Sequence, residues 1–457
     1  MTRYLSAAVT FDASLAAQLI DNVLEEPHRA IAATPGVSLA TVLRYALAAN
    51  RRRLIRDVLL FIYLVLMICT FFLAFITVPL FLFVSWITIL SELYIRFYGQ
   101  PSQPLRPGKF GSAQPPSPAR NSYAARQLAR IDEASTSGNA TIYSGFSPFI
   151  GYGTITSSWS FVVDVTSPRR SGRSGRPRPF TVTQLYDHVA SGLDQIDLPG
   201  MEFRIRLFVN GRDIRDDGRF LRDPDGPPVN SVSPELLASL MTSPEERARP
   251  YLTISVAGWH GDLVTTTFVR FLLSESDLFV EAARTAVPPL RDAFRTVDAM
   301  EMAPADGEFP ALLKTSFVQT VPLLLRSGAA IVHELRRGSR RAQKKRQLSR
   351  MPDYGALISV REAAADSKWQ RYFQVFDNAR YVKTVEQRVF HSLVEFLDAH
   401  DVDTSSLITQ AEVIINNGIE ISGNATVHAD QIVGGPGAQA TRWTSRLRGT
   451  DSKGQAS

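Results

Sequence analysis

The stretch from Val58 to Ser91 decides the fold class. It reads VLLFIYLVLMICTFFLAFITVPLFLFVSWITILS, 34 residues without one charged side chain. About 20 apolar residues cross a hydrocarbon core of roughly 30 Å, whereas one straight helix of this length would measure about 51 Å at 1.5 Å per residue. Pro79 removes a backbone donor and disfavours helix at the residue before it. We therefore predict two crossings joined near residues 76–79; one long tilted or kinked helix is the alternative.

Basic residues flank this apolar stretch on both sides. Arg51, Arg52, Arg53 and Arg56 precede it, and the region from Leu93 to Ile131 has several Arg and Lys but no acidic residue. Basic flanks remain in the cytoplasm, and only an even number of crossings places both of them there. We expect a multi-pass protein of the cell membrane with two spans and both termini cytoplasmic. A hairpin buried in a soluble core is disfavoured because such a hairpin needs a charged face.

Composition limits the other classes. The chain has 457 residues, a hydrophobic fraction of 45% and a net charge of +6, so most of it must fold in water and a many-span transporter is excluded. The single cysteine, Cys69, excludes an intramolecular disulfide and a cysteine metal cluster. The first nine residues lack the pattern of a signal peptide, so the apolar stretch is expected to insert as an uncleaved anchor.

The predicted fold class is an α+β soluble region tethered by a transmembrane helical hairpin and followed by a β-arc-like C-terminal tail. The expected segments are a helical segment (1–50), the transmembrane hairpin (51–98), a Pro- and Ser-rich linker (99–137), an α+β cytoplasmic domain (138–300), a helical region with a polybasic segment (301–402) and a Gly- and Asn-rich β-forming tail with a disordered end (403–457).

Periodicity gives the expected elements. Strands are predicted at Thr141–Tyr143, Trp159–Val165, Tyr251–Val256 and Val264–Phe271, and a hairpin joins Phe203–Val209 to Arg212–Ile214 through Asn210-Gly211. Helices are predicted at Ser38–Ala48, Val182–Leu193, Leu278–Phe294, Leu312–Glu334 and Trp369–His400. Within Leu312–Glu334, the apolar run Val318–Leu325 is expected to pack in a core, and an interfacial position is the alternative.

No catalytic motif supports an enzyme. None of the seven histidines stands in a metal-ligand spacing, and no Walker A loop or G-x-S-x-G elbow occurs. Asp213, Asp216 and Asp217 alternate with arginines, which indicates an exposed charged loop. We therefore predict a protein that is not an enzyme and has no catalytic residues, no metal and no cofactor. An enzyme with a site in the loop Ser144–Gly153 is the least favoured hypothesis.

A basic cluster is the most informative charged feature. It comprises Arg336, Arg337, Arg340, Arg341, Lys344, Lys345 and Arg346. On a membrane-tethered protein each such charge contributes about 1 kcal/mol near anionic lipid. We predict that these residues contact lipid headgroups or an anionic partner; a merely solvated helix face is the alternative. Nucleic acid is disfavoured because no aromatic residues interleave with the charges.

The tail alternates apolar residues with Asn-Gly and Gly-Asn breaks. Ile419, Ile421, Val427, Gln431, Ile432 and Val433 are the candidate self-association residues. Gln431-Ile432-Val433-Gly434 resembles the amyloid-signalling (RHIM-like) cores of immune-type adaptors, although the order of residues departs from theirs. The resemblance implies a homo-oligomer stacked through this segment, and a small β-element packed on the soluble domain is the alternative.

A wider resemblance covers most of the chain. Arg3-Tyr4-Leu5, Glu26 to Ala30, Ser144 to Phe149, Arg284 to Asp298 and the basic-flanked hairpin are similar to uncharacterised actinobacterial membrane proteins. That resemblance assigns no site residues.

Together these features predict a non-enzymatic membrane-anchored interaction or signalling protein. Its expected partners are anionic lipids of the inner leaflet, an unidentified protein and a further copy of the chain. The alternative is a membrane-disrupting effector triggered by self-association of the C-terminal tail.

Overall fold

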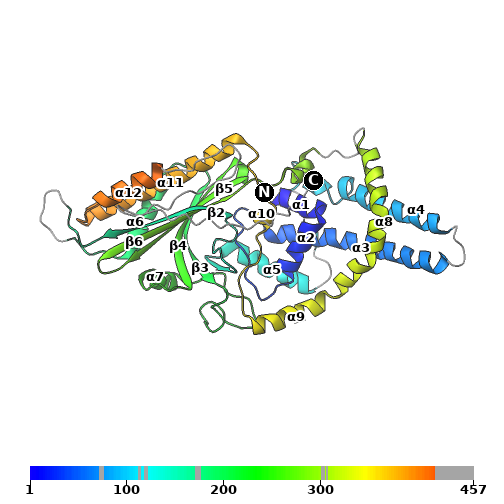
Figure 1. Cartoon of the computed structure of the whole chain (residues 1–457), viewed down its shortest axis with the longest axis horizontal. Helices are drawn as coiled ribbons and strands as arrows, with labels where there is room; N and C mark the ends of the chain where they lie inside the picture. The colour runs from blue at the N-terminus through cyan, green and yellow to red at the C-terminus, as the bar shows by residue number, and fades with distance from the viewer. Residues whose placement is uncertain are drawn as a thin grey trace, which may run out of the picture.

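The computed structural model describes residues 1–71, 77–111, 115–117, 122–169, 177–299, 304 and 307–416. Figure 1 shows two parts side by side: an elongated domain built on a β-sheet, and a helical part from which α3 and α4 project as a hairpin. The soluble region is therefore of mixed α+β class, as predicted.

The described strands form one six-stranded sheet in the order β1-β3-β4-β5-β6-β2. β1 and β3 are parallel, and the other neighbours are antiparallel. The bounds are β1 (Ala140–Tyr143), β2 (Thr154–Asp164), β3 (Met201–Asn210), β4 (Ala248–Gly258), β5 (Leu263–Leu273) and β6 (Asp277–Val287). The predicted strands at 141–143, 159–165, 251–256 and 264–271 are confirmed in β1, β2, β4 and β5.

One face of the sheet carries the main core. It is covered by α6 (Val182–Asp194), α7 (Pro234–Thr242), α11 (Tyr372–Ala399) and α12 (Ser405–Asn416). Val385, Val389 and Leu393 follow the helical period along α11 and pack against alternate residues of the strands. A capping box between Thr181 and Gln184 begins α6. The predicted helices 182–193 and 369–400 are thus confirmed.

Two predicted elements of this domain are wrong. Residues 278–287, expected as helix, form β6, where Leu278, Val280 and Ala282 are buried and alternate with less buried neighbours. Arg212–Ile214 is not a strand, because the antiparallel partner of β3 is β4. Ile214 is instead fully buried in a local core, and the N–H of Gly211 donates to Tyr143 O.

The N-terminal residues form a helical body with its own core. It contains α1 (Thr2–Phe11), α2 (Ala13–Leu19), the π-helix η1 (Ile20–Leu24), the first half of α3 (Leu39–Phe71) and α5 (Ser122–Ser137), with the short helices η2 (Gln103–Leu105), η4 (Asp292–Phe294), η5 (Thr296–Asp298) and α10 (Val360–Ala363) against it. η3 (Trp259–Gly261) joins β4 to β5. The expected short helix 38–48 is only the beginning of α3, which continues through the arginines to Phe71.

The expected linker 99–137 differs from the prediction in its second half. Residues 122–137 are the helix α5, and Leu128 and Ile131 pack in the core of the helical body. Leu105 is also fully buried there. Burial of these apolar residues explains why a segment rich in proline nevertheless belongs to a folded unit.

The expected β-forming tail begins as a helix. α12 includes Val413, Ile414 and Ile415, and Leu407 and Ala411 pack into the main core. Helical packing of these residues outweighs their β propensity. The six candidate self-association residues, Ile419, Ile421, Val427, Gln431, Ile432 and Val433, lie outside the described residues.

Candidate membrane unit and basic helix

The hairpin of α3 and α4 (Thr77–Tyr98) has its apolar side chains on the outside. The exposed residues include Phe61, Ile62, Val65, Leu66 and Ile68 of α3 and Leu80, Phe83 and Ile87 of α4. A contiguous apolar surface of this kind marks a membrane or protein contact. Among the described residues, three helices, α3, α4 and α8 (Glu308–Leu335), are long and apolar enough to cross a membrane. This surface suggests membrane association.

A cluster of charges marks the base of the hairpin. Arg56 binds Asp57 at 2.7 Å and Glu92 at 3.4 Å, and Arg96 binds Glu92 at 2.6 Å. Arg53, which is almost fully buried, donates to Thr10 O in α1 at 2.8 Å. Charges at this depth need partners because desolvation is expensive. The cluster therefore joins both arms of the hairpin to the helical body.

Beyond this cluster the structure describes part of each arm. At 1.5 Å per residue, Val58 to Phe71 extends about 21 Å and Thr77 to Ser91 about 22 Å. A hydrocarbon core is roughly 30 Å thick. Each described part of an arm covers most of that thickness, and residues 72–76 between the two parts lie outside the described residues.

Helix α8 runs across the hairpin (Figure 1). At its beginning, Glu308 accepts a hydrogen bond from the Tyr98 hydroxyl at 2.7 Å. At its end, Glu334 accepts one from Asn50 Nδ2 at 3.3 Å. Tyr98 ends α4, and Asn50 precedes the arginines of α3, so both ends of α8 lie near the base of the hairpin. Between them, Leu324 packs in a small cluster with residues of both arms.

The two faces of α8 have unusual polarity. Ser316, Thr320 and Ser327 are buried against the hairpin, and Trp86 Nε1 donates to Ser316 Oγ at 2.9 Å. The apolar residues point outward: Phe317 is 71% exposed, Val318 65%, Val321 52% and Leu325 65%. Small residues permit close helix contact inside membranes, which explains their inward position. The expected core packing of 318–325 is therefore wrong, and the interfacial alternative agrees better with these exposures.

The basic cluster lies at the end of α8 and on α9 (Arg337–Arg350), and many of its charges have partners within the chain. Arg337 pairs with Glu334, Arg341 with Glu25, Lys344 with Glu26 and Lys345 with Asp225; Arg340 contacts His333. Burial and pairing act differently on Arg341: the hydrogen bond to Glu25 raises its pKa more than desolvation lowers it. These pairs hold α9 against the helical body.

Arg336, Arg346 and Arg350 remain exposed, and none of them has an acidic partner in the part of the chain that the structure describes. Five of the seven predicted residues, Arg337, Arg340, Arg341, Lys344 and Lys345, form an inner set that binds the protein itself. The other two, Arg336 and Arg346, form with Arg350 an outer set that faces solvent. Three of the acidic partners, Asp21, Glu25 and Glu26, come from residues 21–26, whose proximity the sequence did not indicate. The other two are Glu334 and Asp225.

The loop Ser144–Gly153 is held in place by aromatic packing and by hydrogen bonds to Glu362. Phe149 and Tyr152 belong to an aromatic cluster on the sheet face opposite the main core. The carboxylate of Glu362 accepts the N–H groups of Gly151 and Gly153, both at 2.8 Å. These contacts fix the loop from two sides.

The acidic loop is less exposed than expected at one position. Asp217 is buried and accepts hydrogen bonds from Arg219, which lower its pKa; Arg247 lies 3.0 Å away. In the described residues, no group of three or more His, Cys, Asp or Glu is arranged to hold a metal ion.

These observations define the class as an α+β protein with apolar helices that suggest membrane association. The sequence model of the AbeC-like domain matches residues 158–428, more than half of the chain, so the chain belongs to the AbeC-like family. The matched region begins in β2 and includes α8 and α9 but not the α3–α4 hairpin. The match gives no evidence for the actinobacterial or RHIM-like resemblances. Neither a curated protein nor a solved structure matches the chain.

Proposed function

We propose that this chain is a non-enzymatic, membrane-anchored interaction or signalling protein whose AbeC-like domain lies in the cytoplasm. The observation that carries the proposal is the outward-facing apolar surface shared by α3, α4 and α8 next to a charged base. Lipid is the solvent in which such a surface is stable. The basic flanks support a cytoplasmic base.

The attachment of both arms supports a hairpin that enters and leaves on one side. The first half of α3 packs in the core of the helical body. The end of α4 contacts the same body, because Phe97 stacks on Phe11 of α1 with ring centroids 5.4 Å apart. Both arms thus return to one folded unit, which cannot lie on two sides of a bilayer.

The dimensions favour a hairpin that turns near the far leaflet, with α8 in the near interface. The outward apolar face of α8 is the arrangement of a helix lying in the membrane plane. In this proposal the outer basic residues, Arg336, Arg346 and Arg350, contact anionic headgroups, and the inner set stabilises the fold.

Exposed aromatic residues support the interaction role. Tyr372, Phe373 and Phe376 lie together at the beginning of α11, and they are 71%, 68% and 49% exposed. Aromatic residues are enriched in the energetic centres of protein interfaces. A photo-crosslinking residue at Phe373 is expected to capture a discrete protein band in cells, whereas one at exposed Val413 of α12 is not. The absence of a specific band from position 373 would contradict the interaction role.

The native Cys69 tests the topology. It is the only cysteine in the chain and lies exposed in the last turns of α3. We expect an impermeant maleimide to label it after detergent treatment and not in sealed vesicles of either orientation. A Cys69→Ser, Arg350→Cys variant serves as the control and is expected to react only in inverted vesicles.

The outcomes are distinct. Labelling of Cys69 from the outer side, with Arg350→Cys still reacting from the cytoplasmic side, would support two complete spans. Reaction of Arg350→Cys from the outer side would contradict the cytoplasmic position of the domain. The alternative of a membrane-disrupting effector depends on tail residues outside the described part of the chain, and it stays a prediction.

A further inference from the structure

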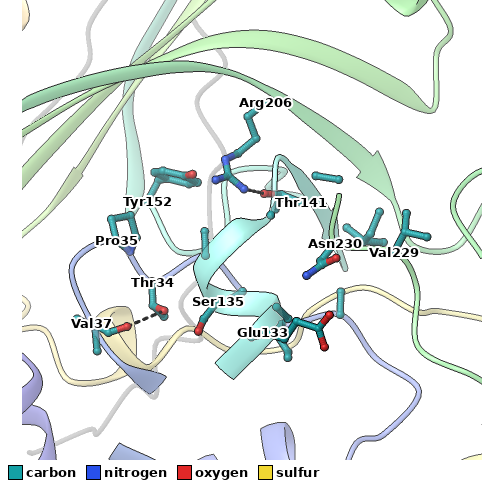
Figure 2. A pocket seen from close by; sticks show the side chains of 18 of the residues that line it. Thr34, Pro35, Val37, Glu133, Ser135, Thr141, Tyr152, Arg206, Val229 and Asn230 are labelled. Atoms are coloured by element: carbon teal, nitrogen blue, oxygen red, sulfur yellow. Dashed lines mark hydrogen bonds between the residues drawn. The ribbon is translucent and has the colours of Figure 1, made fainter. Parts of the chain in front are cut away.

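A cavity of about 450 Å³ lies where the sheet meets the helical body. Its floor is formed by β1, β3 and β4 on the face opposite the main core. Its walls are the segment 29–38, the end of α5 and the loop 227–230. Figure 2 shows the guanidinium of Arg206 between Tyr152 and Thr141, with the end of α5 opposite. Ligand sites commonly have a volume of about 300–1,000 Å³.

Arg206 stands in this floor without a counter-ion. It is only 9% exposed. Its side chain contacts uncharged groups: Nη1 donates to Thr141 Oγ1 at the long distance of 3.5 Å, and the guanidinium also interacts with the hydroxyl of Tyr152. Its Nε has no acceptor among the described residues. Among the described residues, no carboxylate pairs with it. A buried charge in this condition is strongly unfavourable.

Other buried arginines of the same sheet differ. Arg270 pairs with Glu281 at 3.0 Å, and Arg284 pairs with Glu386 at 2.5 Å. Both have the carboxylate partner that burial requires. Arg206 faces the cavity instead, and burial lowers its pKa without a compensating acid.

Further donors surround the same space. The hydroxyl of Thr253 on β4 is buried and has no partner. Tyr152 is 3% exposed, and its phenol interacts with Arg206. A guanidinium with neighbouring hydroxyl groups matches the oxygen atoms of a carboxylate or phosphate.

We propose that the cavity binds a small oxyanion ligand, a carboxylate or a phosphate ester, whose charged group lies on Arg206. Thr141, Tyr152 and Thr253 supply hydroxyl contacts to that group. The apolar wall of Pro35, Pro228 and Val229 contacts the rest of the molecule. Three acidic residues, Asp132, Glu133 and Glu202, share the lining with Arg29, Arg130 and Arg204, so these charges offset one another. The inference does not depend on the membrane topology.

Thermal unfolding of the full chain in detergent tests the proposal. The probes are inorganic phosphate and acetate, each compared with chloride at equal ionic strength. One or both are expected to raise the Tm of the wild-type chain. Phosphate alone would assign a phosphate ester, and acetate alone a carboxylate.

Arg206→Gln is expected to weaken the binding of the effective anion by at least about tenfold, because a charged hydrogen-bond donor is lost. The matched control is Arg249→Gln on the neighbouring strand β4, where the arginine is exposed, lies outside the cavity lining and donates to Glu246 O. That control is expected to respond to the anion as the wild type does. In chloride alone, Arg206→Gln is expected to unfold no earlier than the wild type, since it removes an unpaired buried charge.

Three results would overturn the proposal: no anion raises the wild-type Tm above its value in chloride, Arg206→Gln responds as the wild type does, or Arg249→Gln loses the response equally. If Arg206→Gln does not fold, Thr253→Val replaces it. The near-isosteric valine is expected to weaken the same anion several-fold, and an unchanged response would overturn the proposed floor.

Discussion

At the residue scale, a buried charge of the sheet is neutralised by a partner on a neighbouring helix. Glu386 of α11 lies almost completely buried between two strands. It receives both hydrogen bonds of Arg284 from β6 and a third from Trp159 Nε1 of β2 at 2.9 Å. This group fastens α11 to the edge where β2 pairs with β6.

Breaking that pair is expected to be costly. Glu386→Leu or Arg284→Met leaves one buried charge without its partner, so each should lower the free energy of unfolding by about 3–5 kcal/mol. The double variant Arg284→Met, Glu386→Leu is expected to lose much less than the sum. Urea unfolding of the four proteins measures the coupling, and additive losses would show that the pair is not coupled.

Glu362 gives a pH-dependent prediction. Burial raises the pKa of its carboxyl above the usual 4.5, against the opposing hydrogen bonds from Gly153 and Gly151. The folded state therefore holds the proton more tightly than the unfolded state. Stability from this group is complete below pH 4.5 and declines as the pH rises through the folded pKa. Glu362→Gln, which stays neutral, should gain stability relative to the wild type between about pH 4 and pH 7. A Tm difference that is constant over this range would contradict the assignment.

At the scale of elements, the inverted polarity of α8 gives a direct spectroscopic prediction. In a Cys69→Ser background, a nitroxide at Phe317 should collide mainly with oxygen, which concentrates in lipid. A nitroxide at Phe146, which is 97% exposed on a loop of the sheet domain, should collide mainly with a water-soluble nickel complex. One at buried Ser316 should respond to neither. Nickel accessibility at 317 equal to that at 146 would place α8 in water.

On α9, the outer charges are expected to affect lipid binding and the inner charges to affect stability. Arg346→Gln with Arg350→Gln is expected to reduce co-purified anionic lipid by about fivefold per charge, because each charge near anionic lipid contributes about 1 kcal/mol. Arg341→Gln with Lys344→Gln removes pairs to Glu25 and Glu26 and should mainly lower the Tm. The outer-set prediction fails if the second pair of substitutions removes as much lipid as the first.

Sequence patterns predicted elements with strong local signals. The uncharged run, the alternating strands β4 and β5 and the long amphipathic α11 were all predicted from their periodicity. β6 was not, because Glu281, which pairs with Arg270, and Arg284, which pairs with Glu386, interrupt the apolar alternation and imitate an amphipathic helix. On α8 the serines are buried and most apolar residues are exposed, which is the reverse of the pattern expected for a helix surrounded by water.

At the scale of the whole molecule, the sequence could not assemble the cavity. Its lining comes from six separate segments of the chain, so no local motif exists. One signal for the cavity was available in β3. Glu202, Arg204 and Arg206 stand at alternate positions and so place three charges on one face of the sheet, a face that a sheet domain usually covers. Only the tertiary fold shows that Arg206 lacks a partner. Likewise, the acids at 21–26 meet α9 through folding alone.

Removal of the hairpin tests the division of the molecule. A chain in which residues 58–91 are replaced by a short Gly-Ser linker should keep its sheet domain, because the main core contains no residue of the hairpin. Its circular dichroism should retain the β signal. Its membrane fraction should become extractable by alkaline carbonate, since α8 alone holds only the interface. Persistent resistance to carbonate would mean that α8 itself spans the bilayer.

The unbroken course of α3 has a mechanical consequence. One helix leads from the cavity wall at its beginning, through the helical body, into the apolar arm. Because α3 is continuous from Leu39 to Phe71, the apolar arm is rigidly connected to the helical body. In the proposed membrane position, a small displacement of the segment 29–38 would therefore change the inclination of the apolar arm.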